Sequence, residues 1–345
     1  MPLLVDPRRL RRALAAVPGL PAEYALEPLA GQGVAHDHIR LVGTGLLARV
    51  PRVSQMGLAA AENLAYQAAC FRRMAPSGRT PALFAVLPAG DDLPMGALLV
   101  REIAGRPARV PGDLPAIAAT LAAIHRMPLP RDRAPLGDDP DPVGGTWRVI
   151  RAQADFFAAA APAPEVAAAL EAELEWAAGF CAAAAASDQP RTLVGTDTHP
   201  GNFLVDAGGD AFFVDLEKAL YGAPAIDAAH ATLPTSVMWS AADAQPVAAE
   251  AVLAFERAWL AGLPGGLAQR IRPWVRPLRR LTWLRSMSWF ARWRVVSRRE
   301  GGWSAAALDP ATASHVAGRV ALFFSPGMVD RARSEWTGPG ALPDP

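Results

Sequence analysis

Short apolar runs bounded by glycine-containing turns dominate the first 104 residues of the chain, and they predict strands. Two segments there have a helical pattern instead, one near the start and a longer one in the middle. The expected strands cover 24–29, 38–42, 45–50, 82–87 and 96–102, and the expected helices cover 7–17 and 58–74. Residues 1–104 therefore predict a small antiparallel sheet with one main helix.

From residue 105 onward the pattern becomes mostly helical. A helix is expected over 114–125, and an Ala/Glu-rich helical stretch over 154–186 is interrupted by Pro162 and Pro164, which do not fit a helix interior. A Pro- and Asp-rich loop is expected over 129–145. We therefore expect an α+β chain with two parts, residues 1–104 and residues 105–345.

One short segment interrupts the helical part. Two apolar strands, 203–205 and 211–214, flank an Asp/Gly turn. A β-hairpin at this position would bring Asp197, Asn202 and Asp215 to one edge.

Composition argues against two classes of partner. The chain has 345 residues with 34 Lys and Arg against 33 Asp and Glu, so its net charge of +1 gives no reason to expect a nucleic acid partner. Its longest apolar stretches fall short of the roughly 18 residues that a membrane helix needs, and the first residues turn polar before a signal-peptide core forms. We expect a folded cytoplasmic protein without a membrane partner, and its oligomeric state stays open.

Cysteine and lysine are both rare in the chain. Cys70 and Cys181 lie in helix-like segments and are expected to be buried thiols, because a single pair cannot build a disulfide framework. Lys218 is the one lysine in the sequence, all other strongly basic residues being arginine. We expect Lys218 to be a surface charge.

Asp197 and Asn202 stand in the order D-x-x-x-x-N, and Asp215 follows an apolar strand. Phosphoryl transfer needs an oriented hydroxyl nucleophile and divalent cations that bridge the phosphates. Asp197 would orient or deprotonate the hydroxyl, while Asn202 and Asp215 would offer oxygens to Mg²⁺. The same residues could instead cap turns and end a strand, so this spacing alone leaves both interpretations open.

The surrounding residues favour the chemical interpretation. The segment 193–229 resembles the catalytic segment of the aminoglycoside phosphotransferase and choline kinase-like family. Three stretches carry the resemblance: Gly195-Thr196-Asp197-Thr198-His199-Pro200-Gly201-Asn202 is similar to H-G-D-x-H-P-G-N, Val214-Asp215-Leu216-Glu217 to I-D-W-E, and Tyr221-Gly222-Ala223-Pro224-Ala225-Ile226-Asp227 to G-x-P-x-x-D.

This resemblance implies a small-molecule kinase with a bilobal protein-kinase-like fold. Its N-lobe would be the small antiparallel sheet with one main helix, and its larger C-lobe would be mostly helical. ATP or GTP would be the phosphate donor, Mg²⁺ the metal, and a hydroxyl group of a small molecule the acceptor. Asp197 would be the catalytic residue, and Asn202 and Asp215 the metal ligands.

Weaker motifs extend the resemblance toward the N-terminus. Gly31 and Gly33 lie in a segment that looks like the family's glycine-containing loop over the nucleotide phosphates. Arg49 stands at the position of the family's phosphate-contacting cation, and Glu62, on the following helix, would hold that cation in place or be only a solvated helix residue. Glu102 lies in a stretch similar to the interlobe hinge, whose backbone meets the adenine edge.

The sequence departs from the family pattern where Gly195 and Thr196 replace the common His-Gly. That histidine usually braces the catalytic loop, so its loss concerns the rate more than the type of reaction. His199 would compensate for it or merely pack in the loop. For Asp227 the resemblance implies a structural role, buttressing the catalytic loop.

The resemblance does not identify the acceptor. Residues 131–190 are acidic, whereas residues 241–345 are rich in arginine, which argues against a polycationic acceptor and for a small neutral, zwitterionic or singly charged one. Trp283, Trp289 and Trp293 lie on helical stripes that favour core packing over a cation-binding surface.

Two other functions compete with an active small-molecule kinase. One is a catalytically weak or regulatory relative that binds nucleotide. The other is a protein kinase, which is disfavoured because no A-P-E segment follows Asp215-Leu216-Glu217.

Overall fold

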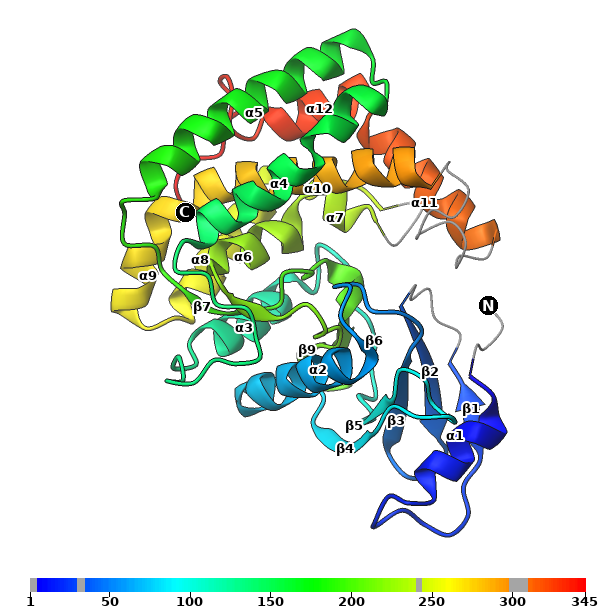
Figure 1. Cartoon of the computed structure of the whole chain (residues 1–345). Helices are drawn as coiled ribbons and strands as arrows, with labels where there is room; N and C mark the ends of the chain where they lie inside the picture. The colour runs from blue at the N-terminus through cyan, green and yellow to red at the C-terminus, as the bar shows by residue number, and fades with distance from the viewer. Residues whose placement is uncertain (1–4, 30–34, 240–243, 298–309) are drawn as a thin grey trace.

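The computed structural model describes residues 5–29, 35–239, 244–297 and 310–345, and these form an N-terminal sheet beside a larger, mostly helical part (Figure 1). The strands are β1 (Leu26–Pro28), β2 (His36–Leu41), β3 (Leu46–Pro51), β4 (Leu83–Leu87), β5 (Ala97–Arg101), β6 (Arg106–Pro107), β7 (Thr192–Val194), β8 (Phe203–Val205), β9 (Ala211–Phe213) and β10 (Leu220–Gly222). The helices are α1 (Pro7–Leu14), α2 (Ala60–Met74), α3 (Leu114–His125), α4 (Pro142–Ala159), α5 (Pro164–Ala184), α6 (Pro224–Thr232), α7 (Pro234–Val237), α8 (Ala249–Ala261), α9 (Gly265–Ile271), α10 (Val275–Val296), α11 (Pro310–Phe323) and α12 (Pro326–Arg333). The α+β fold class expected from the sequence is confirmed.

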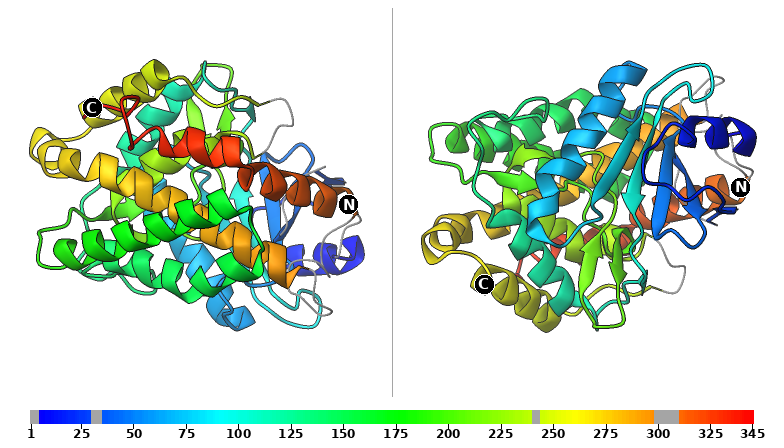
Figure 2. Two further views of the ribbon diagram at one scale, coloured as in Figure 1. Left: turned by 90° about the horizontal axis from the view of Figure 1, so that it is seen from above. Right: turned by 90° about the horizontal axis from the view of Figure 1, so that it is seen from below.

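The N-terminal sheet has five antiparallel strands in the order β1-β2-β3-β5-β4. Successive side chains of a strand point to opposite faces, and β5 shows this directly. Leu98 and Val100 belong to the large core that includes α2 and the C-terminal helices, whereas Ala97 and Leu99 belong to a smaller core beneath α1. The sheet is therefore covered on both faces, and α2 lies between it and the helical part (Figures 1 and 2). The division of the chain after residue 104 stays a prediction.

The longest helix, α10, packs against α4 and α6 in the helical part. Trp283 and Trp293 on this helix are buried, which confirms core packing for them. Trp289 is half-buried and packs edge-on against Trp239, with 5.8 Å between the ring centroids. Cys70 and Cys181 are buried free thiols, as expected.

Two expectations about secondary structure are wrong. The loop expected over 129–145 ends early, because α4 begins at Pro142. Asp141 caps this helix by accepting a hydrogen bond from the Gly144 amide at 2.9 Å, and Pro142 occupies the first helical position, where a missing N–H costs nothing. In addition, β10 pairs antiparallel with β7, although the sequence pattern gives no strand there.

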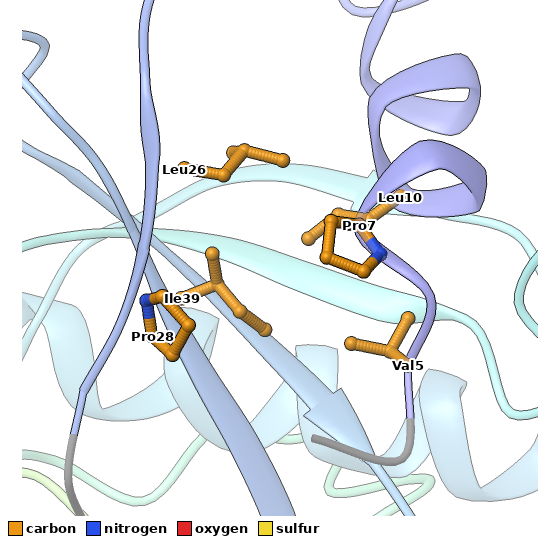
Figure 3. Close-up of a pocket in the computed structure, with 6 residues that line it drawn as sticks. All are labelled: Val5, Pro7, Leu10, Leu26, Pro28 and Ile39. Carbon is orange, nitrogen blue, oxygen red and sulfur yellow. The ribbon is translucent and has the colours of Figure 1, made fainter. Parts of the chain in front are cut away.

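Within the described ranges, no helix is both long enough and apolar enough to cross a membrane. A small gap lies between α1 and the edge of the sheet (Figure 3). Its walls are apolar side chains, namely Val5, Pro7, Leu10, Leu26, Pro28 and Ile39. Because they offer nothing to orient a polar ligand, we regard this gap as imperfect packing beneath α1.

Candidate active site

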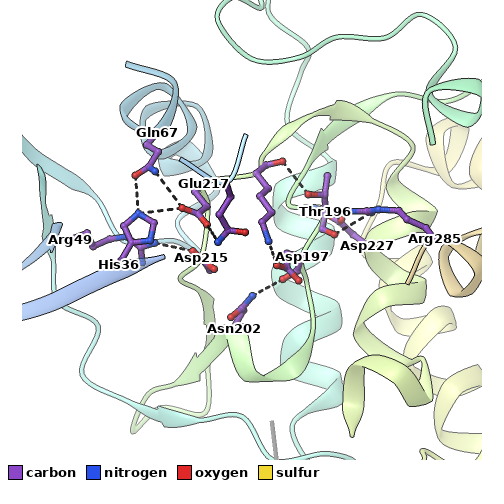
Figure 4. Close-up of polar contacts among 12 residues, drawn as sticks. His36, Arg49, Gln67, Thr196, Asp197, Asn202, Asp215, Glu217, Asp227 and Arg285 are labelled. Atoms are coloured by element: carbon purple, nitrogen blue, oxygen red, sulfur yellow. Dashed lines mark hydrogen bonds and ion pairs between the residues drawn. The ribbon is translucent and has the colours of Figure 1, made fainter. Parts of the chain in front are cut away.

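A hairpin gathers three polar side chains at one place (Figure 4). Strands β8 and β9 pair antiparallel, the loop 195–202 precedes β8, and Asp215 follows β9. The Val214 amide donates to the Asn202 carbonyl at 3.0 Å, and Asn202 Nδ2 donates to the Asp197 carbonyl at 2.8 Å. The hairpin expected from the sequence is therefore present, and Asp197, Asn202 and Asp215 lie together.

Asp227, near the start of α6, holds the loop 195–202 in place. Its fully buried carboxylate accepts hydrogen bonds from the amides of Gly195 at 2.7 Å and Thr196 at 2.8 Å. His125 Nε2 lies 3.1 Å from the same carboxylate, and the Thr198 hydroxyl donates to the Asp227 carbonyl at 2.8 Å. These contacts are those that a loop-buttressing residue needs.

The two residues that depart from the family pattern are accommodated locally. A Cβ on Gly195 would lie 2.6 Å from the Phe213 ring, so this ring fills the space where a longer side chain would begin. Thr196 has a φ of 61°, a conformation that usually favours glycine. Its hydroxyl donates to the Lys218 carbonyl at 3.1 Å. Packing on Phe213 and hydrogen bonds thus hold the loop without the family's histidine.

His199, proposed as structural support, does not replace that histidine through hydrogen bonds. Its ring packs edge-on against His230, with 6.3 Å between centroids, and its Nδ1 has no hydrogen-bond partner in the described part of the chain. Bracing of the loop therefore comes from Asp227, and the contribution of His199 is packing.

Lys218 lies in the site, so the expectation that it is a surface charge is wrong. Its ammonium donates to Asp197 Oδ2 at 2.7 Å. Burial alone would raise the pKa of Asp197, but the charge and hydrogen bond of Lys218, together with His199 and His230, more than offset this and lower it. Burial likewise opposes the charge of Lys218, yet Asp197 and Asp215 raise its pKa overall. Asp197 is consequently an ionised carboxylate at neutral pH.

Arg49 points into the site because β3 alternates. Its neighbours Ala48 and Val50 face the smaller core, so the guanidinium faces α2 and the hairpin. Arg49 Nη2 contacts Asp215 Oδ1 at 2.9 Å, and Nη1 donates to the Val214 carbonyl at 3.0 Å. Burial raises the pKa of Asp215, but the charges of Arg49, His36 and Lys218 together lower it further than burial raises it.

The predicted partnership between Glu62 and Arg49 is wrong. Glu62 is exposed, and in the described residues the ion-pair partner of Arg49 is Asp215. The α2 residue that reaches the site is instead the buried Gln67, whose Nε2 donates to Glu217 at 3.3 Å. His36 also contacts Glu217, at 3.2 Å. Burial and the nearby Asp215 charge raise the pKa of Glu217 to about 7.

The residues proposed for nucleotide binding are only partly described. Gly31 and Gly33 lie outside the described residues. Glu102 follows β5. Its carboxylate accepts a hydrogen bond from Arg40 at 2.7 Å and its amide donates to the Gly45 carbonyl at 2.9 Å, so its amide is already used and its role in the hinge stays a prediction.

The arginines of the C-terminal region differ in environment. Arg280 pairs with the fully buried Glu173 on α5, and Arg279 pairs with Glu335. Glu335 offsets the charge of Arg279, whereas Glu173 is shared by Arg280 and Arg333 and offsets only one of their two charges. Arg285 is different, since it reaches the loop 195–202 with one long contact of 3.5 Å to the Thr196 carbonyl. Burial lowers the pKa of Arg285.

The oxygen atoms of the site fit a magnesium ion held mainly by a nucleotide. Asp215 Oδ2 and Asn202 Oδ1 accept no hydrogen bond from the described part of the chain, so both remain available as ligands. The described residues contain no cluster of three or more metal-binding side chains. Mg²⁺ commonly uses one or two protein oxygens together with phosphate oxygens and water, which is the donor set found here.

Solved structures of small-molecule kinases share this fold. A choline/ethanolamine kinase family protein from Mesorhizobium loti is 20% identical, with 94% of this chain and 98% of that chain covered and a TM-score of 0.57. An amicoumacin kinase in complex with AMP-PNP and Ca²⁺ is 14% identical, with 94% of each chain covered and a TM-score of 0.57. A spectinomycin phosphotransferase in complex with ADP and spectinomycin is 11% identical, with coverages of 96% and 98% and a TM-score of 0.61. None of the curated proteins compared with the chain matches it.

The sequence itself matches the model of the phosphotransferase enzyme family over residues 28–278. This span covers more than half of the chain and includes Arg49, the loop 195–202, Asp215 and Asp227. The chain therefore belongs to the phosphotransferase enzyme family.

Proposed function

We propose that the chain transfers the γ-phosphate of ATP or GTP to a hydroxyl group of a small molecule in a Mg²⁺-dependent reaction. The observation that supports this most is the assembly of Asp197, Asn202 and Asp215 by one loop and one hairpin. Asp227 braces that loop through two backbone amides, so the geometry does not depend on a bound ligand.

Asp197 acts on the acceptor. Because its carboxylate is ionised at neutral pH, it can accept the proton of a hydroxyl group within hydrogen-bond reach. The hydroxyl oxygen forms a bond to the γ-phosphorus and its proton passes to Asp197. The bond from the γ-phosphorus to the bridging oxygen breaks, and its electron pair leaves with the nucleoside diphosphate.

Residues of both the N-terminal sheet region and the helical part would hold the phosphates of the nucleotide. Asp215 and Asn202 would hold Mg²⁺, which supplies neutralisation of the phosphate charge when bound. Arg49 would contact the phosphates from β3, and Gly31 and Gly33 would cover them. The backbone around Glu102 would meet the edge of the nucleotide base.

The acceptor is a small neutral, zwitterionic or singly charged hydroxyl compound. Because Arg279 and Arg280 are both held in ion pairs within the fold, this proposal now rests on Arg285, whose guanidinium lies next to Thr196 and therefore close to Asp197. Arg285 adds a second cation near the reacting carboxylate, beside Lys218, which suits one anionic group on the acceptor and disfavours a polycation.

The second candidate is a catalytically weak or regulatory relative that binds nucleotide. The observation that favours it is the replacement of His-Gly by Gly195 and Thr196, with Thr196 in an unusual backbone conformation.

Nucleotide binding and turnover distinguish these two functions. Calorimetry with ATP and GTP, each in Mg²⁺ and in EDTA, should show Mg²⁺-dependent binding for both candidates. Only an active kinase should then release diphosphate nucleotide in the presence of a panel of neutral, zwitterionic and polycationic alcohols. Asp197→Asn is the control and should bind nucleotide while losing about 10²- to 10⁴-fold in kcat. Mg²⁺-dependent binding without turnover on any alcohol would favour the regulatory relative.

A further inference from the structure

Lys218 lies against the proposed catalytic carboxylate, Asp197, and close in sequence to Asp215. It lies three residues after Asp215, and its ammonium contacts Asp197 Oδ2 at 2.7 Å. It is also the only lysine in a chain that has 34 lysine and arginine residues in total. In a chain that otherwise uses arginine for every strong base, the one lysine thus lies against the proposed catalytic carboxylate.

A purely stabilising ion pair does not account for this arrangement. The side chains of Lys218 and Asp197 are 31% and 26% exposed, so water reaches both partners. Most of each side chain is nevertheless buried, and the cost of taking two charges out of water offsets much of what their attraction contributes to stability. The pair is therefore better explained by what binds next to it.

The ammonium has unused capacity for an anion. An ammonium carries three N–H donors, and in the described residues Lys218 uses one of them, toward Asp197. Its backbone is fixed, because the Lys218 carbonyl accepts the Thr196 hydroxyl. A γ-phosphoryl group that meets both the acceptor at Asp197 and a metal at Asp215 would lie within reach of the two remaining donors.

On the basis of the function proposed above, we propose that Lys218 is a catalytic residue whose ammonium bridges Asp197 to the γ-phosphoryl group. It stays protonated throughout the transfer. Its N–H groups donate to the non-bridging oxygens of the phosphoryl group as the acceptor oxygen bonds to phosphorus and the bond to the leaving diphosphate breaks. Lysine suits this role because its charge is compact and its donors rotate, whereas arginine presents a planar fork.

The single lysine permits a direct observation of this contact. Protein made with ¹³C-labelled lysine, without a lysine in any tag, gives one lysine ε-carbon resonance, which belongs to Lys218. We expect AMP-PNP with Mg²⁺ to shift this resonance and ADP with Mg²⁺, which lacks the γ-phosphate, to leave it near its position in the free protein. In the free protein, Asp197→Asn should move the resonance and lower the pKa of Lys218, which proves that the signal reports on the site.

The outcomes separate this proposal from the proposed function. If calorimetry shows that AMP-PNP binds and yet the resonance stays unchanged, or if ADP shifts it equally, the bridging role is overturned and the kinase assignment stands. If neither nucleotide binds, both proposals fall together.

Kinetics give the second test. Lys218→Met keeps the length of the side chain and removes its charge, and we expect a loss of about 10²-fold or more in kcat, as for other single donors that stabilise transition-state charge. Lys218→Arg should recover part of that loss, and the KM of the acceptor should change little. Arg270→Met, which removes one exposed ion pair on α9, is the matched control and should leave kcat unchanged. A Lys218→Met protein that keeps more than a third of the wild-type kcat would refute the catalytic role, and the resonance experiment decides the matter if this variant does not fold.

Discussion

Arg49 ties the N-terminal sheet to the residue that follows β9, because its guanidinium donates to both the carboxylate of Asp215 and the carbonyl of Val214. The Arg49 side chain is only 6% exposed, whereas Asp215 is 29% exposed. Nucleotide phosphates that approach Arg49 must therefore share it with Asp215, and a metal ion at Asp215 would weaken the ion pair from the other side. Binding of a phosphate to Arg49 and binding of a metal ion to Asp215 would therefore influence each other.

Replacement of Arg49 tests this link. Arg49→Ala should raise the nucleotide KM and also destabilise the fold, because it leaves the Val214 carbonyl and the Asp215 carboxylate without their donor. Arg49→Lys should restore part of the affinity, since it keeps the charge and loses the fork geometry. Steady-state kinetics and thermal melts of both variants measure the two effects separately.

Glu62→Ala is the matched control for Arg49. Because Glu62 is exposed and does not pair with Arg49, this variant should leave the nucleotide KM within about twofold of the wild type. A rise as large as that of Arg49→Ala would show that the two residues meet once nucleotide is bound.

The two proposed metal ligands should differ in how much they contribute to nucleotide binding in Mg²⁺. Asp215→Ala and Asn202→Ala should both weaken nucleotide binding in Mg²⁺, with Asp215→Ala the more severe because it removes the formal charge that faces the cation. Binding in EDTA should change less than binding in Mg²⁺ for both variants. Equal affinities in Mg²⁺ and EDTA for the wild-type protein would contradict a metal site at these residues.

Gly195 should tolerate no side chain while Phe213 keeps its place. Gly195→Ala puts a Cβ 2.6 Å from the Phe213 ring, and overpacking of this kind typically costs about 1–3 kcal/mol. The double variant with Phe213→Leu, which lacks the ring, should recover part of the loss. Urea denaturation of the two single variants and the double variant gives the coupling energy, and strict additivity would show that the two side chains do not compete for space.

The central part of the site could be predicted because it is local in sequence. Asp197, Asn202, Asp215 and Asp227 lie within one short stretch, and strand pairing in that stretch determines how they meet. The departure at Gly195 could be seen but not explained, since the Phe213 ring that fills the space comes from the far strand of the hairpin.

The sequence-based expectations for Glu62 and Lys218 differ from the structure because the role of each residue depends on the direction in which its side chain points. The position of Glu62 after β3 leaves open whether it pairs with Arg49 or is a solvated helix residue, but the buried stripe of α2 runs through Asn63, Gln67, Cys70 and Met74. These residues follow helical spacing, so the phase of the helix is a signal that already turns Glu62 toward solvent. For Lys218 no such periodicity exists, because it lies in a turn where only the fold determines which carboxylate its ammonium reaches.

Replacement of Arg285 tests the proposed charge of the acceptor. Arg285→Gln removes the charge beside Thr196 and keeps a polar side chain of intermediate length, so the KM of an acceptor with one anionic group should rise about tenfold or more. The nucleotide KM should stay within about twofold. An unchanged acceptor KM across neutral and anionic alcohols would remove Arg285 from the acceptor site. Efficient phosphorylation of polycationic aminoglycosides, with kcat/KM above about 10⁴ M⁻¹s⁻¹, would overturn the acceptor class altogether.

Stability should depend on pH through buried groups near the site. Burial and the Arg49 charge lower the pKa of His38 to about 3, far below its ordinary value of 6.5. The unfolded chain therefore takes up a proton at His38 between pH 6.5 and about 3 that the folded protein does not, so this residue makes the protein less stable as the pH falls through that window. Glu217 acts in the opposite sense. Its pKa of about 7 lets the folded protein hold a proton that the unfolded chain releases above pH 4.5, so its burial costs stability as the pH rises from 4.5 to 7.

Two variants should consequently change the pH dependence in opposite directions. His38→Gln should flatten the loss of stability on acidification from pH 6.5 to 4.5, by at most about 1.4 kcal/mol per pH unit, which is the limit for one proton. Glu217→Gln should steepen that loss, because it removes a group that favours the folded protein at lower pH. Urea denaturation at several pH values between 4.5 and 7 measures both slopes. If His38→Gln leaves the slope unchanged, His38 must already be protonated in the folded protein, and the effect of burial and Arg49 on its pKa would be refuted.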